Sequence, residues 1–382
     1  MVMSRRSWMT RAGTVGALGL MGTPLAWAAP LPAGTQRFVI GQSIPQTGAV
    51  SDIGLAFAAG TKMYVDEFNS KPATGLHFEL QQMDDGYDPD RAAGNARKLL
   101  ANGADVLFGF VGTESSNAAE AVAQKQNAIF FAPFAGADNL RDGTHANVFN
   151  VRPSMADEAF KIVRHCATIG QTRIAVMAED DAMGRAGLQA VSAAIAELKL
   201  PPLVGTVFVP TNSSDVGNAA ATLAKSNPQV IIQAALFTSA AAFIQKMRKT
   251  GYIGMFMNYS VVGINPLFLA LDKDIRGVVV SQVVPSPRST STAVVREYLA
   301  AIENTDQFPT YESLEGFIAA KALVEGVRRA GRGANTASLQ KAFATMTAYD
   351  VGGFRLNLRA GVRDSAWGIE LVSLTADGRV LR

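Results

Sequence analysis

The sequence predicts an α/β protein with two parallel β-sheets, each covered by helices on both faces. Short apolar runs rich in β-branched residues alternate along the chain with longer segments of helical period. The runs are continuously apolar, as strands buried on both faces require. The chain has 382 residues, of which 48% are apolar, enough for two domains with substantial cores.

The first half of the chain alternates in this way four times. We expect strands at 38–40, 77–83, 106–108 and 129–131, and helices at 54–68, from about 90 to 100, and at 115–126. Pro45 and Gly48 supply the turn after the first strand, and Pro89 opens the second helix.

The second half repeats the pattern. We expect strands at 173–177 and 230–232, helices at 184–198 and 238–249, and a long helix that ends at Gly331. Two of these helices carry apolar stripes at helical spacing, Ala240, Ile244 and Met247 on one and Phe317, Ala320, Val324 and Val327 on the other. We interpret both stripes as core.

The first 28 residues are typical of an export signal. Arg5 and Arg6 precede an apolar stretch over 12–26, which ends in an A-x-A sequence at 26–28. The arginine pair indicates twin-arginine export. The alternative is a short membrane anchor, but the apolar stretch is shorter than the roughly 20 residues that span a bilayer. We expect cleavage and a soluble protein outside the cytoplasmic membrane, without a lipid anchor.

Charge and cysteine content exclude several classes of function. Residues 1–28 contain three arginines and no acidic residue or lysine, so they account for the whole formal net charge of +3. The remaining chain is neutral, which gives no electrostatic basis for binding nucleic acid or an anionic membrane. Cys166 is the only cysteine, which excludes an internal disulfide, a redox CxxC pair and a cysteine zinc site.

No catalytic constellation is found, so we expect no enzyme activity, no cofactor and no metal. The sequence has no GxGxxG, GxxxxGK[ST], HExxH or GxSxG motif. Its three histidines, His77, His145 and His165, lack ligand spacing and are read as structural or surface residues. The acidic segment 84–90 resembles a calcium loop, but Asn95 stands where the twelfth-position acid belongs. We read that segment as a turn before a helix, with Tyr87 facing a cleft.

Ligands of open α/β sheets bind beyond the carboxyl ends of the strands, which directs attention to three loops. Residues 112–117 (GTESSN) follow a buried strand, open a helix and carry three hydroxyls. Such a helix start binds a carboxylate or phosphate. The alternative is plain N-capping by Ser115 or Ser116. The polar loop at 42–48 and the FAGA segment at 134–137 are the other two.

Several stretches, in order along nearly the whole chain after the signal, together resemble the Leu/Ile/Val-type periplasmic solute-binding proteins of ABC transporters. They are GQSIPQTGAVSDIG (41–54), QQMDDGYDPDRAAGNARKLL (81–100), FGFVGTESS (108–116), FAPFAGA (131–137), IAVMAEDDAMGRAGL (174–188) and SLEGFIAAKALVEGVRRAG (313–331).

The resemblance implies a type I periplasmic binding protein fold, with two doubly wound parallel-sheet lobes joined by a three-crossing hinge that closes around ligand. The N-terminal lobe would comprise 36–150 plus 285–347, and the C-terminal lobe 151–284 plus 348–382. The crossings would lie near 150–152, 284–287 and 348–352.

The resemblance also implies a ligand site between the lobes. Thr113, with Gly112, Ser115 and neighbouring amides, would hold a ligand carboxylate. Phe134 and Gly136 stand where the family has a small residue and a hydroxyl, and Met183 stands where it commonly has a tyrosine. A second aromatic position falls at Leu236 or Phe237, of which we choose Phe237. Tyr259 lies within 258–261, where the family's ammonium-pairing acid is expected and no acid is present.

These departures bear on the ligand. Burying an ammonium group without a partner costs several kcal/mol, so an aliphatic α-amino acid requires that Asp85, Asp180 or Asp181 reach the cleft. A small carboxylate with an apolar or aromatic body fits the remaining residues better, and branched-chain amino acids, amides or other solutes are the alternatives. The resemblance implies a membrane ABC permease as partner, and we expect a monomer in the periplasm. A sensory module and an exported enzyme are the competing functions.

Overall fold

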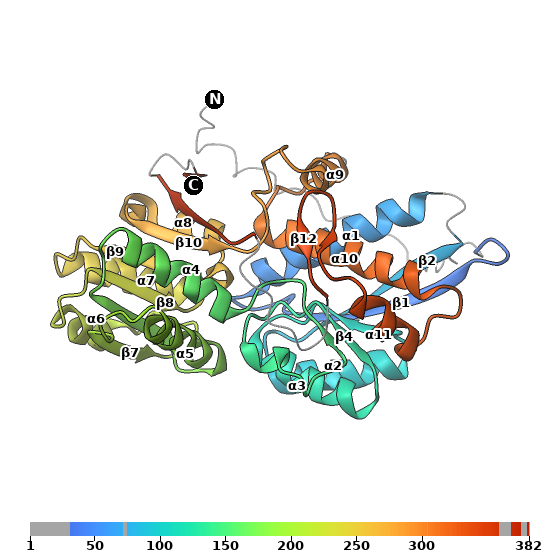
Figure 1. The fold of residues 1–382 in the computed structure, drawn as a ribbon, viewed down its shortest axis with the longest axis horizontal. Helices are drawn as coiled ribbons and strands as arrows, with labels where there is room; N and C mark the ends of the chain where they lie inside the picture. The colour runs from blue at the N-terminus through green and yellow to red at the C-terminus, as the bar shows by residue number, and fades with distance from the viewer. Residues whose placement is uncertain (1–30, 72–74, 304, 359–367, 376–379, 382) are drawn as a thin grey trace, which may run out of the picture. The chain divides into compact units, whose positions relative to one another are not determined.

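The computed structural model describes residues 31–71, 75–303, 305–358, 368–375 and 380–381. The predicted signal at 1–28 lies outside these residues. From residue 35 on, the described residues form two large β-sheets and one two-stranded sheet (Figure 1). Each large sheet and the helices that pack on it form one lobe.

The first lobe has a five-stranded, wholly parallel sheet in the order β2-β1-β3-β4-β5. Its strands are β1 (Gln36–Ile44), β2 (Leu76–Asp84), β3 (Val106–Phe108), β4 (Ile129–Phe131) and β5 (Val148–Phe149). Its helices are α1 (Ser51–Ser70), α2 (Pro89–Ala101), α3 (Thr113–Lys125), the 3₁₀ turn η1 (Asp138–Arg141), α10 (Tyr311–Ala330) and α11 (Thr336–Ala344). The predicted strands at 106–108 and 129–131 match β3 and β4 in both bounds.

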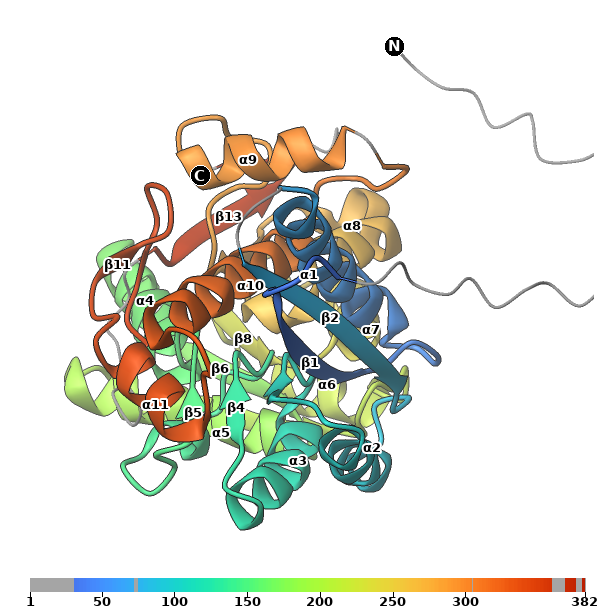
Figure 2. The same ribbon diagram turned by 90° about the vertical axis from the view of Figure 1, so that its right-hand side faces the viewer.

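Helices α1 and α10 lie side by side on one face of the first sheet, and α2 and α3 lie together on the other (Figure 2). Gly60 and Gly316 allow the first pair to pack closely. A Cβ atom on Gly60 would lie 1.7 Å from the Ser313 carbonyl oxygen, and one on Gly316 would lie 2.0 Å from that of Phe57. The predicted stripe of α10 is fully buried, so its reading as core is confirmed.

The second lobe has a seven-stranded sheet in the order β14-β13-β10-β9-β8-β6-β7. Its strands are β6 (Ile174–Glu179), β7 (Gly205–Val209), β8 (Val230–Ala234), β9 (Met255–Asn258), β10 (Val278–Gln282), β13 (Glu370–Leu374) and β14 (Val380–Leu381). Its helices are α4 (Met155–Thr168), α5 (Ala182–Glu197), α6 (Gly217–Ala224), α7 (Phe237–Lys249) and α8 (Ile264–Leu271), with 3₁₀ turns η2 (Ser260–Val262) and η3 (Asp272–Ile275).

This second sheet departs from the predicted parallel arrangement at one edge. β13 pairs with β10 antiparallel, and β14 pairs with β13 antiparallel. The chain between β10 and β13 includes α9 (Ala293–Ile302), the α10 and α11 helices of the first lobe, and a small hairpin of β11 (Tyr349–Asp350) and β12 (Arg355–Leu356). A strand that returns from the other lobe has no crossover helix to fix it parallel, so it joins the edge in the opposite sense.

The chain passes between the two sheets three times, after β5, after β10 and before β13. The first connection is short, since β5 ends at Phe149 and α4 begins at Met155. Helix α4 starts with a capping box, in which Ser154 and Asp157 each bond the other's backbone N–H. In the part of the chain that the structure describes, no helix combines the length and apolarity needed to cross a membrane.

Candidate functional site

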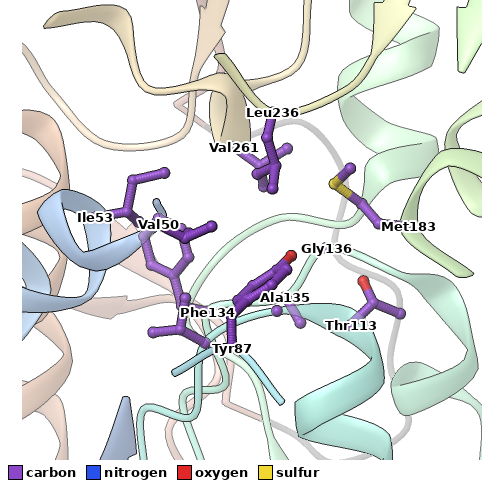
Figure 3. Close-up of a pocket in the computed structure, with 12 residues that line it drawn as sticks. Val50, Ile53, Tyr87, Thr113, Phe134, Ala135, Gly136, Met183, Leu236 and Val261 are labelled. Atoms are coloured by element: carbon purple, nitrogen blue, oxygen red, sulfur yellow. The ribbon is translucent and has the colours of Figure 1, made fainter. Parts of the chain in front are cut away.

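Residues of both lobes line a pocket at the carboxyl ends of their strands (Figure 3). The first lobe contributes Val50, Ile53, Tyr87, Val111, Gly112, Thr113, Phe134, Ala135 and Gly136, and the second contributes Met183, Leu236 and Val261. The cavity among these side chains has a volume of about 20 Å³. The pocket is therefore narrow, and the lobes lie close together around it.

Gly112 and Thr113 form one end of the pocket, where α3 begins. The N-cap residue is Gly112, at φ 95°, and no side chain caps the helix. Ser115 does not cap it, and the Ser116 hydroxyl donates to the Phe110 carbonyl instead, at 3.2 Å. The helix starts two residues earlier than predicted, so neither Ser115 nor Ser116 is its N-cap residue. Its first amides and the buried Thr113 side chain remain at the pocket end.

Tyr87 covers this end of the pocket. Its backbone has φ 67°, a left-handed conformation that is unfavourable for a residue with a side chain. The buried Asp85 carboxylate holds the turn by accepting from the Tyr87 N–H at 2.9 Å and from the Ser43 hydroxyl at 2.7 Å. A Cβ on Gly112 would lie 2.5 Å from Tyr87 Cε2, so only glycine allows the ring to sit there. Burial, with Asp181 and Glu179 nearby, raises the Tyr87 pKa, which keeps the phenol protonated.

The loop after β4 forms the floor of the pocket. Phe134 donates its N–H to the Phe110 carbonyl at 2.8 Å and accepts from the Gly112 N–H at 3.1 Å, which ties this loop to the one after β3. The Phe134 ring meets Phe57 edge-on, with centroids 5.4 Å apart. Gly136 accepts from the Met155 N–H at 2.6 Å, which joins the loop to the first helix of the second lobe.

The second lobe closes the pocket with three apolar side chains from three loops. Met183 lies in the first turn of α5, which Asp181 caps by accepting from the Gly184 N–H at 2.7 Å. Leu236 is the residue before α7, and Val261 lies in η2 after β9. Each follows a strand of the sheet, so the three loops converge on the same edge.

Six of the nine residues expected from the sequence line this pocket, and three lie elsewhere. Ser115 is buried in the first turn of α3, and Phe237 is half-buried at the start of α7, where Leu236 lines the pocket in its place. Tyr259 is fully buried and donates its hydroxyl to the Gly187 carbonyl at 2.9 Å, which directs the ring toward α5. The 3₁₀ turn after β9 presents Val261 to the pocket instead.

Sequence reasoning missed Val50 and Ile53, which stand at the start of α1. The loop after the first strand was expected at 42–48, and the lining residues follow it by only a few positions. An apolar residue at a helix start gives no signal that distinguishes a pocket wall from core. Val111, an apolar residue of the loop after β3, was also missed, whereas Ala135 lies within the expected FAGA segment.

All twelve lining residues are uncharged, and four acids outside the lining have other partners. Asp85 holds the Tyr87 turn, and Asp181 caps α5 and accepts from the Thr211 hydroxyl at 3.1 Å. Asp180 pairs with Arg185 at the surface. Glu158 accepts from the Ser260 N–H at 2.8 Å and is fully buried. Within the described residues, therefore, no acid lines the pocket to receive an ammonium group.

Glu179, at the end of β6, is a buried acid beside the second-lobe loops. Its Oε1 accepts from the Ser239 hydroxyl at 2.6 Å and from the Asn212 N–H at 2.8 Å. Burial raises its pKa to about 7, partly offset by these donors and by the Leu236 N–H. Its side chain does not line the pocket.

Among the described residues, no group of three or more histidine, cysteine, aspartate or glutamate side chains is arranged to hold a metal ion. The one cysteine, Cys166, is buried in α4, and burial raises its thiol pKa to about 12. The site so defined is a neutral, mostly apolar pocket with hydrogen-bond donors at one end, between two α/β lobes. This is the site of a two-lobed binding protein.

Comparison with known proteins agrees with this class of protein. A family model described as "Periplasmic binding protein" matches residues 38–365, and the chain belongs to this family. The chain is similar to Leu/Ile/Val-binding proteins of this family, being 24% identical over 347 residues to Leu/Ile/Val-binding protein homolog 7 of Brucella suis biovar 1 (strain 1330), covering 84% of each chain.

Solved structures share the fold over almost the whole chain. A possible leucine/isoleucine/valine-binding protein from Rhodopirellula baltica SH 1 superposes with a TM-score of 0.86 at 26% identity, covering 93% of this chain and 98% of that one. A branched-chain amino acid ABC transporter protein from Thermus thermophilus, with bound valine, has a TM-score of 0.80 at 16% identity, covering 91% and 95%. The predicted family and fold are confirmed.

Proposed function

We propose that this protein is the substrate-binding component of an ABC importer, which captures a small carboxylate-bearing solute between its lobes by hinge closure. The observation that carries the proposal is the neutral pocket shared by both lobes, with the uncapped start of α3 at one end. It has binding features and no catalytic constellation, which supports a receptor rather than an enzyme.

The ligand carboxylate would lie against Gly112 and Thr113. The first amides of a helix and its dipole favour an anion, and the Thr113 and Tyr87 hydroxyls supply further donors. Each charge-assisted hydrogen bond contributes about 1.5–3 kcal/mol, against the roughly 8 kcal/mol of micromolar binding. Burial of the ligand's apolar body against Phe134, Met183 and Leu236 would supply the rest.

The uncharged lining favours an organic or aromatic acid without an ammonium group. Placing an unpaired ammonium in this pocket would cost several kcal/mol, more than the roughly 1.5–3 kcal/mol that a buried leucine side chain returns. A branched-chain amino acid is the second candidate, and the names of the relatives and the valine bound to the Thermus thermophilus protein favour it.

We further propose the lobe boundaries 36–150 plus 285–347 and 151–284 plus 348–382, a periplasmic monomer freed by cleavage of a twin-arginine signal, and a membrane permease as partner. The two sheets, formed by strands within 36–149 and within 174–282 plus 370–381, support these boundaries. A sensory module would use the same pocket but signal to another membrane protein. Only the partner distinguishes the two.

The test is a thermal-shift panel on the purified mature protein. It includes leucine, valine, 4-methylpentanoate, benzoate, 4-hydroxybenzoate and succinate, with small-angle scattering for any compound that raises Tm. We expect a carboxylate to raise Tm by a few degrees and to reduce the radius of gyration. If no member of the panel changes either quantity, the proposed function is wrong. Native mass spectrometry of protein purified from its own host would identify a retained ligand directly.

A further inference from the structure

Arg152 lies on the first connection between the lobes and is almost completely buried. It stands between β5 and α4, and its side chain is 1% exposed. A buried cation is tolerated only where nearby groups compensate its charge. The partners of Arg152 come from both lobes.

In the first lobe, Arg152 contacts a buried acid and a pocket wall. Its Nε lies 3.2 Å from Oε1 of Glu315, which is in α10. Its guanidinium carbon lies 4.1 Å from the centroid of the Phe134 ring, within the range of a cation–π contact.

In the second lobe, Arg152 Nη2 donates to the Ser260 hydroxyl at 2.9 Å. That hydroxyl in turn donates to Glu158 Oε1 at 3.1 Å, and the Ser260 N–H donates to Oε2 at 2.8 Å. Ser260 is followed directly by Val261, which lines the pocket. One guanidinium therefore contacts the wall residue Phe134 on one side and the residue before Val261 on the other.

We infer that Arg152 is a positioning residue that latches the two lobes together, and that it touches no ligand. The inference rests on the proposed function in one respect, since closure of the lobes is what captures the solute. Arg152 stands on the connection and links the lobes through both sides of this network, with Glu315 and Phe134 on its first-lobe side and Ser260 on its second-lobe side. Losing that bond should favour the open form without altering the pocket lining.

Closure can be measured without any ligand. The Ala182 N–H donates to Glu114 Oε1 at 3.3 Å, which brings α5 of the second lobe against α3 of the first. In a Glu114→Cys/Ala182→Cys reporter, a short reagent with two thiol-reactive ends would join the two cysteines in the closed form, so the initial rate of cross-linking follows the closed population. The native Cys166 is buried and does not compete. Labelling each introduced thiol separately corrects for differences in reactivity.

Two serine variants of this reporter distinguish a bond that holds the lobes closed from a bond that only stabilises the second lobe. Ser260→Ala removes the bond that ties Arg152 to the loop after β9 of the second lobe. Ser281→Ala is the matched control, because the Ser281 hydroxyl also donates to Glu158 but belongs to the second lobe, in β10. We expect Ser260→Ala to slow cross-linking at least about fivefold, since a hydrogen bond to a charged group is lost. Ser281→Ala should cross-link at the reporter's own rate.

The inference fails if Ser260→Ala cross-links as fast as the reporter, or if Ser281→Ala slows it equally. Urea denaturation of each variant verifies that it is folded under the assay conditions. Because no ligand is added, a negative thermal-shift panel would refute the proposed function and leave this result standing. A negative cross-linking result would remove the latch and leave the binding function intact.

Discussion

The guanidinium carbon of Arg152 lies 4.1 Å from the centroid of the Phe134 ring, so a buried cation stacks on a side chain that lines the pocket. Arg141, also buried, donates to the carbonyls of Ala137 and Ala135 at 2.8 and 3.2 Å and to that of Arg152 at 3.1 Å. The pocket floor and the first connection are thus held by two arginines.

The ion pair of Arg152 and Glu315 should show strong coupling in a double-mutant cycle. Arg152→Met leaves the Glu315 carboxylate buried without its cation, and we expect a loss of about 3–5 kcal/mol in the free energy of unfolding. Adding Glu315→Gln removes the stranded charge, so the double variant should be more stable than Arg152→Met alone. Urea denaturation measures both. Additive losses would mean that the two side chains do not act as a pair.

Thr113→Ala should weaken binding of the carboxylate that gives the largest thermal shift. We expect a loss of about tenfold or more, because one hydrogen bond to a charged group is removed. Ser115→Ala is the control, since Ser115 is buried in the same helix turn and does not line the pocket. Isothermal titration calorimetry measures both. Unchanged affinity in Thr113→Ala, or an equal loss in Ser115→Ala, would place the carboxylate elsewhere.

The backbone strain at Tyr87 should appear as a difference in stability between two variants that both lack the ring. Tyr87→Gly and Tyr87→Ala both delete the ring, but only glycine adopts φ 67° without a penalty. We expect Tyr87→Gly to be more stable than Tyr87→Ala by about 1 kcal/mol in urea denaturation. Both variants should accept longer carboxylates than the parent. Equal stability of the two variants would show that the turn relaxes when the ring is lost.

Glu179 should make stability depend on pH. Its pKa is 4.5 in the unfolded chain and about 7 in the folded protein. Between these values the unfolded chain loses the proton while the folded protein keeps it, so stability falls as pH rises and levels off above about 7. The full effect is about 3 kcal/mol at 1.36 kcal/mol per pKa unit.

Glu179→Gln lacks this titration. From pH 5 to pH 8 its free energy of unfolding should improve by about 2–3 kcal/mol relative to the parent. Glu315, whose pKa burial also raises to about 7, titrates in both proteins and cancels in the comparison. Identical pH profiles would show that Glu179 titrates normally in the folded state.

The features that local sequence determines were predicted well. Strands such as 106–108 follow from continuous apolar runs, and Thr113 and Phe134 follow from the rule that ligands bind where parallel strands end. Position along the chain is enough to place these residues in the pocket.

Features that depend on distant contacts were not predicted. Tyr259 turns away because its hydroxyl meets Gly187, 72 positions earlier, and Arg152 meets Ser260, 108 positions later. Leu236 and Phe237 are adjacent, and only the start of α7 decides which one reaches the pocket. The hydrophobic pattern of the sequence does not predict which distant residues make such contacts.

The most direct test of the account compares leucine with 4-methylpentanoate, which has the same carbon skeleton and carboxylate but no ammonium group. Isothermal titration calorimetry on the mature protein at pH 7 gives both affinities. The neutral lining predicts that 4-methylpentanoate binds at least about tenfold more tightly than leucine, because no side chain in the pocket pairs with the ammonium group. Tighter binding of leucine would contradict the account.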